Sequence, residues 1–86
     1  MRIYVYNLSI EVTEEELWRE FLVFGKVTSA KIAKNAYDGN SRGFGFVEML
    51  NISEGQAAIT SLNTKVLKDS LLFCIALNDC SGVGVP

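Results

Sequence analysis

The chain has 86 residues, of which 49% are hydrophobic and 21% are charged, and its formal net charge at pH 7 is −2. This length allows one domain with a small core, and the composition fits a folded globular unit and excludes a chain that is disordered throughout. No apolar run reaches the roughly 18 residues that cross a bilayer, and the apolar stretch at the start is too short for a secretory signal, so we expect a cytoplasmic protein with no membrane contact.

Two features of the composition argue against catalysis and metal binding. The sequence contains no histidine, the commonest metal ligand and general base. Its two cysteines, Cys74 and Cys80, do not make a zinc site by themselves. In the cytoplasm both are predicted to be free thiols, with a disulfide between them as the less favoured alternative. We therefore expect no enzyme, no metal and no cofactor.

The first predicted elements are a strand and a helix. Residues 3–8 are β-branched and aromatic, which is typical of a strand. Thr13 and Glu16 have the spacing of a capping box and predict the start of a helix. Gly25 is expected to end it in a left-handed conformation. Residues at helical spacing define its inward face: Leu17, Phe21 and Phe24.

Two further strands are predicted in the middle of the chain. Residues 27–34 form the first of them, and residues 42–49 form the second. Between them, Asp38 and Gly39 make a dipeptide that is a strong signal for a hairpin turn.

The last third of the sequence predicts a second helix and a last strand. Ser53 and Gln56 suggest another capping box. The last strand covers residues 71–77, with Phe73 and Ile75 facing inward. Residues 79–86 are predicted to be a flexible tail behind a domain of residues 1–78. One face of the second helix is apolar: Gly55, Ala58, Ile59 and Leu62.

The element order β-α-β-β-α-β predicts the fold class α+β, with a ferredoxin-like arrangement. Right-handed crossovers place both helices on one face of a four-stranded antiparallel sheet and leave the other face uncovered. Side-chain alternation then puts four aromatic rings on the uncovered face: Tyr4, Tyr6, Phe44 and Phe46. Exposed aromatic surface of this extent favours a binding function.

Two segments resemble the conserved motifs of the RNA recognition motif family. Arg42–Met49, with the sequence RGFGFVEM, resembles the RNP1 octamer, and residues 3–8, IYVYNL, look like the RNP2 hexamer. The short chain is also similar to small bacterial proteins of this family with a single such domain. Tyr6 departs from the pattern, because the family usually has glycine there.

The resemblance implies a role for each matched position in binding single-stranded RNA. Tyr4 and Phe46 would stack on successive bases, Phe44 would pack against sugars, and Arg42 would pair with a phosphate. For Tyr6, base contact and packing among neighbouring rings are equally open. Lys31 is expected to supply general attraction for phosphates.

The alternative to RNA binding is a different class of function, that of a protein-interaction or dimerisation module with the same fold. Trp18 and Leu22 are neighbours on one turn of the first helix, away from its inward face, and would form a contact for a partner or a second copy. Packing within the domain is the other reading of this pair. Single-stranded DNA is a further alternative ligand, because stacking does not detect the 2′-hydroxyl group.

Overall fold

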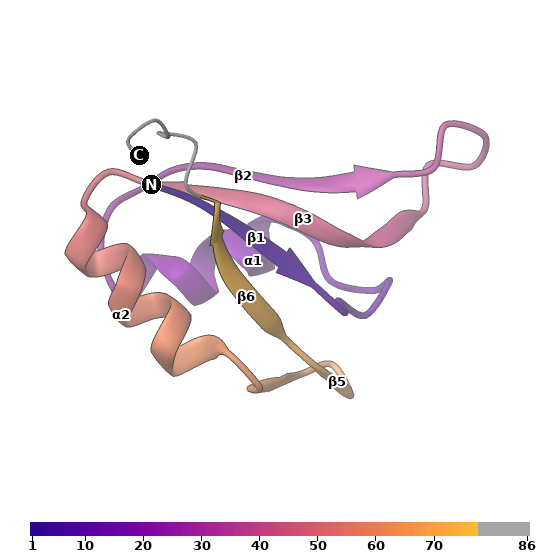
Figure 1. Ribbon diagram of the computed structural model, residues 1–86. Coiled ribbons are helices and arrows are strands. Elements are labelled where there is room, and N and C mark those ends of the chain that lie inside the picture. The colour runs from indigo at the N-terminus through magenta and orange to yellow at the C-terminus, as the bar shows by residue number, and fades with distance from the viewer. Residues whose placement is uncertain (78–86) are drawn as a thin grey trace, which may run out of the picture.

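The computed structural model describes residues 1–77, which fold into a sheet covered on one side by two helices (Figure 1). In chain order the elements are β1 (Arg2–Tyr6), α1 (Glu14–Leu22), β2 (Val27–Lys34), β3 (Ser41–Met49), α2 (Ile52–Leu62), β4 (Val66–Leu67), β5 (Ser70–Leu71) and β6 (Phe73–Leu77). No helix in this part of the chain is long and apolar enough to cross a membrane.

The main sheet has four strands in the order β2-β3-β1-β6, and every neighbouring pair is antiparallel. The two central strands, β1 and β3, are the ones that contain the RNP2-like and RNP1-like segments. Both helices lie on the same side of the sheet (Figure 1). The predicted ferredoxin-like α+β fold is therefore confirmed, and the opposite face of the sheet is covered by no helix of the described chain.

A single apolar core lies between the sheet and the helices. The alternation of side chains along β1 sends Ile3 and Val5 into it, and α1 contributes Leu17 and Phe21. All four side chains are completely buried. Because the inward positions of β1 are apolar and fully buried, its remaining side chains at Tyr4 and Tyr6 are directed to the uncovered face.

Helix α1 begins as predicted and ends differently. The Thr13 hydroxyl accepts a hydrogen bond from the Glu16 amide at 3.1 Å, and the Glu16 carboxylate accepts one from the Thr13 amide at 3.0 Å. The expected left-handed cap at Gly25 is wrong, because the helix stops at Leu22 and Val23 keeps right-handed helical angles. Gly25 instead leaves room for the Glu54 side chain, which would collide with a Cβ atom at this position.

Helix α2 begins before the predicted capping box. Its N-cap is Asn51, so Ser53 already lies within the helix, and the expectation of a cap at Ser53 is wrong. The Asn51 side chain makes no cap hydrogen bond and donates to Glu54 Oε1 at 3.0 Å instead. The predicted inward face is confirmed, with Gly55, Ala58 and Leu62 buried.

The last strand has the opposite orientation from the prediction. Cys74 is buried, whereas Phe73 is half-buried and Ile75 is 45% exposed. Cross-strand partners in an antiparallel pair share a face, and Phe73 is paired with the outward-facing Tyr6. Phe73 and Ile75 therefore lie on the uncovered face of the sheet, and the expectation that they face inward is wrong.

A small hairpin before β6 was not predicted from the sequence. Its strands β4 and β5 pair through Val66 with Leu71 and Leu67 with Ser70. The connecting residues Lys68 and Asp69 both adopt positive φ angles, of 51° and 69°. Neither is glycine or asparagine, so the usual sequence signal of such a turn is missing.

Cys74 is a free, buried thiol, so the prediction of free thiols is confirmed for this cysteine. Burial raises its pKa to about 11 because the thiolate would lose its hydration. Cys80 and the expected tail at 79–86 lie outside the described residues.

Candidate nucleic-acid interface

The uncovered face of the sheet gathers five aromatic side chains from three neighbouring strands. They are Tyr4 and Tyr6 of β1, Phe44 and Phe46 of β3, and Phe73 of β6. We call this set the aromatic platform. The strand register places its members opposite one another, because Tyr4 pairs with Phe46, and Tyr6 pairs with both Phe44 and Phe73.

The rings of the aromatic platform contact one another and form a continuous surface. The centroids of Tyr4 and Phe46 are 5.4 Å apart, and those of Tyr4 and Phe44 are 5.8 Å apart. Phe44 and Phe46 meet edge to face, with a centroid distance of 6.4 Å. These distances are typical of favourable aromatic pairs, so the rings hold each other in place before any ligand binds.

Tyr6 is held between two other rings. Its ring stacks on Tyr4 at 5.3 Å and on Phe73 at 5.4 Å, with interplanar angles of 21° and 22°. Near-parallel rings at this distance cover each other's faces. Of the two roles open for Tyr6, the structure thus supports packing among neighbouring rings.

Phe73 is the platform residue that the sequence argument missed. The last strand is apolar at nearly every position, so the alternation of polar and apolar residues could not decide its orientation. Its pairing with Tyr6 depends on the register between β1 and β6, which no local pattern records.

The glycines of the RNP1-like segment allow β3 to fit between its neighbours. A Cβ atom at Gly45 would collide with the backbone carbonyl oxygen of Lys31 on β2. Gly43 has a φ angle of +84°, which a side chain would strain. Gly45, which lies between Phe44 and Phe46, therefore allows the close approach of β2 to β3.

Basic side chains border the platform on the β2 and β3 side. The Arg42 guanidinium carbon is 5.9 Å from the centroid of the Phe44 ring, and the side chain is exposed. Lys31 is exposed on β2 and pairs in register with Phe46. Neither forms an ion pair within residues 1–77, so both charges are available to an anion.

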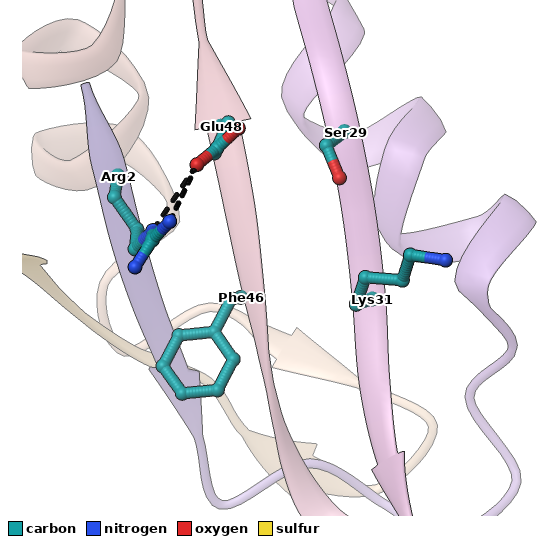
Figure 2. Close-up of a pocket in the computed structure, with 5 residues that line it drawn as sticks. All are labelled: Arg2, Ser29, Lys31, Phe46 and Glu48. Carbon is teal, nitrogen blue, oxygen red and sulfur yellow. Dashed lines mark hydrogen bonds and ion pairs between the residues drawn. The ribbon is translucent and has the colours of Figure 1, made fainter.

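Glu48, the acidic residue of the RNP1-like segment, pairs with Arg2 rather than with Arg42. The Arg2 Nε and Nη2 atoms donate to Glu48 Oε2 at 3.1 and 2.9 Å. Figure 2 shows this pair beside the ring of Phe46, at the edge of a shallow depression of about 370 Å³. Ser29 and Lys31 of β2 complete its lining.

The negative charge of the protein is concentrated on the helix side. Ion pairs join Glu15 to Arg19, Glu20 to Lys65, and Glu16 to Lys68. The pKa of Glu16 is lowered by its hydrogen bond from the Thr13 backbone and by the nearby Lys68. This acidic region therefore lies away from the aromatic platform.

Trp18 and Leu22 lie on α1, and neither belongs to the buried core. Their exposed fractions are 37% and 50%. The predicted pair thus forms a partly exposed apolar surface in the helix layer, whereas the aromatic platform occupies the opposite face of the sheet.

Among known proteins, a family model described as RNA recognition motif matches residues 3–72. RNA binding protein PG1 is 39% identical in its crystal structure, with a TM-score of 0.85 over 87% of this chain and 90% of that one. The second RRM domain of yeast poly(U)-binding protein Pub1 is 27% identical, with a TM-score of 0.79 over 86% of this chain and 89% of that one.

A structure of the Sxl-lethal protein in complex with RNA is also similar. It is 25% identical, with a TM-score of 0.84 over 88% of this chain, which spans 46% of the length of that one. The family model covers most of the chain, and it includes both strands that form the centre of the aromatic platform. The chain belongs to the RNA recognition motif family.

Proposed function

We propose that the protein binds single-stranded RNA through the aromatic platform. The observation that supports this most directly is the continuous set of rings on a sheet face that no described helix covers. Each RNA base has a flat π surface that can stack on an exposed ring. Family membership and the similar RNA-bound Sxl-lethal structure support the same ligand.

The proposed contacts differ between the members of the platform. Phe46 is 37% exposed and Tyr4 lies directly beside it, so these two rings stack on neighbouring bases. Phe44 packs against the sugar between them, and Arg42 and Lys31 neutralise phosphates. Tyr6 stacks on Tyr4 and is itself stacked on Phe73 of β6, so these two rings support Tyr4 without a base contact of their own. The proposed activity is binding without catalysis.

Mapping of amide chemical shifts during titration with a short oligouridine tests this function. The resonances of Tyr4, Phe44 and Phe46 should shift, while those of α1 should stay in place. An RNA that shifts no resonance on the sheet would refute the proposal. The matching DNA oligonucleotide should be titrated in parallel, because equal affinity for both would make single-stranded nucleic acid in general the ligand.

Protein binding through α1 is a second candidate function. The exposure of Trp18 and Leu22 favours it, since neighbouring apolar side chains on a surface often mark an interface. This surface and the platform lie on opposite sides of the sheet, so the two activities are compatible.

The proposed functional unit is the domain of residues 1–78, and its proposed location is the cytoplasm, which cell fractionation can test.

A further inference from the structure

The depression beside Phe46 combines an aromatic surface with a charged pair, and this pair has unused hydrogen-bonding capacity. Arg2 and Glu48 stand on adjacent strands and are paired in register, so the sheet fixes their separation. Both side chains are about half exposed, at 49% and 41%. A base that stacks on Phe46 would meet this pair with one of its edges (Figure 2).

The hydrogen bonds within the pair determine what it can still offer to a ligand. Arg2 directs both Nε and Nη2 to Glu48 Oε2. Its planar fork is therefore occupied, and Nη1 is its main unused donor atom. Glu48 Oε1 accepts no hydrogen bond from residues 1–77 and has two lone pairs available. The pair thus keeps one strong acceptor atom, Glu48 Oε1, and one donor atom, Arg2 Nη1, that are not used within the pair.

The four RNA bases match this arrangement to different extents. On its Watson–Crick edge guanine presents two neighbouring donors, N1–H and the 2-amino group, and the acceptor O6 beside them. Adenine and cytosine each present one donor on that edge, and uracil presents a single donor between two acceptors. A carboxylate accepts and never donates when ionised, so it favours the edge with two adjacent donors.

We propose that Phe46, Glu48 and Arg2 form a guanine-selective subsite, an inference that rests on the RNA-binding function proposed above. The guanine ring stacks on Phe46. Its N1–H and 2-amino groups donate to Glu48 Oε1, and its O6 accepts from Arg2. Lys31 extends away from the ion pair in Figure 2 and leaves this edge free for the base.

The test compares short oligouridines that contain a single guanosine, adenosine, cytidine or uridine at the centre. Binding is measured by fluorescence anisotropy, and the flexible register of oligouridine lets the variable base reach the preferred position. The wild type should bind the guanosine oligonucleotide about tenfold more tightly than the others, as one good bidentate contact allows. Inosine, which lacks the 2-amino group, should lose part of this advantage.

Two matched variants assign the preference to the subsite. Glu48→Gln should reduce the preference for guanosine over uridine at the variable position to about twofold or less. Glu15→Gln is the control, because Glu15 forms a similar ion pair on α1, away from the sheet. It should leave the preference unchanged.

The possible failures are distinguishable. If the wild type binds all four oligonucleotides with similar affinity, the guanine subsite is refuted and RNA binding stands. A guanosine preference that persists in Glu48→Gln would also refute the subsite. If no oligonucleotide binds to the folded wild type, the proposed function and the subsite are both wrong.

Discussion

Tyr6 illustrates how one side chain changes the character of an RNA-binding surface. A glycine at this position would leave the faces of the Tyr4 and Phe73 rings open toward each other. Tyr6 fills this space and stacks on both rings, at 5.3 and 5.4 Å. Its contribution is to restrict Tyr4, which lowers the entropy lost when a base binds.

Phe46 is the residue whose loss should affect RNA binding most directly. Phe46→Ala should weaken binding to oligouridine by about 1–3 kcal/mol, the usual value of one stacked base. The ring is 37% exposed, so the variant should remain folded. Isothermal titration calorimetry gives the affinity, and circular dichroism confirms the fold.

Ile52→Ala provides the matched control for this prediction, because Ile52 is an exposed apolar residue on α2, in the helix layer. Its affinity for RNA should equal that of the wild type. An unchanged affinity in folded Phe46→Ala would contradict stacking at this ring.

Cys74 should be chemically inert in the folded protein although its neighbour in sequence, Phe73, is part of the platform. Burial raises the pKa of this thiol from its ordinary value to about 11, so the folded state disfavours the thiolate. The contribution of this thiol to stability is thus present below pH 9 and is lost as the pH rises toward 11.

In a Cys80→Ser background, Cys74 should react with a thiol reagent at neutral pH only after denaturant is added. Mass spectrometry of the labelled chain measures this. Rapid labelling of the native protein would show that the side chain is accessible and would contradict its burial.

At the scale of elements, short sequence patterns predicted several features that depend on contacts within a few residues of the chain. Strand β2 has the predicted bounds, and the capping box of α1 has the expected hydrogen bonds. Gly39 takes a positive φ angle in the turn that its Asp-Gly dipeptide indicated. The four rings expected outward on β1 and β3 also lie together, because their strands alternate clearly between core and surface residues.

The misplaced cap at Ser53 is a local error, whereas the errors at β6 and Gly25 concern partners that are distant in the sequence. The orientation of β6 follows from its register with β1, and the space beside Gly25 is occupied by the side chain of Glu54. The Arg2–Glu48 pair joins residues 46 positions apart, so no motif indicated it. For the same reason the sequence predicted the stacking surface but missed Phe73 and the proposed guanine contact.

Helix α1 provides the test of whether its exposed surface has a structural or an interacting role. Exchanging both Trp18 and Leu22 for Ala should lower the free energy of unfolding by less than the 2–5 kcal/mol that is typical of buried large side chains. RNA affinity should stay within about 0.5 kcal/mol, as for distant and independent sites. Thermal melting and an RNA titration measure the two quantities.

Light scattering on the same samples reports self-association. If α1 is an interface between copies, the wild type forms dimers and the double variant is monomeric. A monomeric wild type combined with a large loss of stability in the double variant would show that the two side chains act in packing, and would contradict the interface.

At the scale of the whole molecule, the distribution of charge matters more than the net value of −2. Five glutamates and one arginine lie within residues 11–20, so the rest of the sequence has a small excess of basic residues. Three of these glutamates are neutralised by ion pairs in the helix layer. The sheet face can therefore attract RNA although the protein as a whole is acidic.

The small number of basic residues beside the platform predicts a weak dependence of RNA binding on salt. Arg42 and Lys31, with Lys34 further along β2, can neutralise two or three phosphates. Each contact contributes a slope of about −0.7 in a plot of log affinity against log salt concentration, so the total should be about −2.

Arg42→Gln should make this slope less negative by about 0.7, whereas Phe46→Ala should lower the affinity equally at every salt concentration, because stacking releases no counterions. Anisotropy titrations at several salt concentrations measure both effects, and a slope steeper than about −4 would require many more phosphate contacts than this face of the sheet provides.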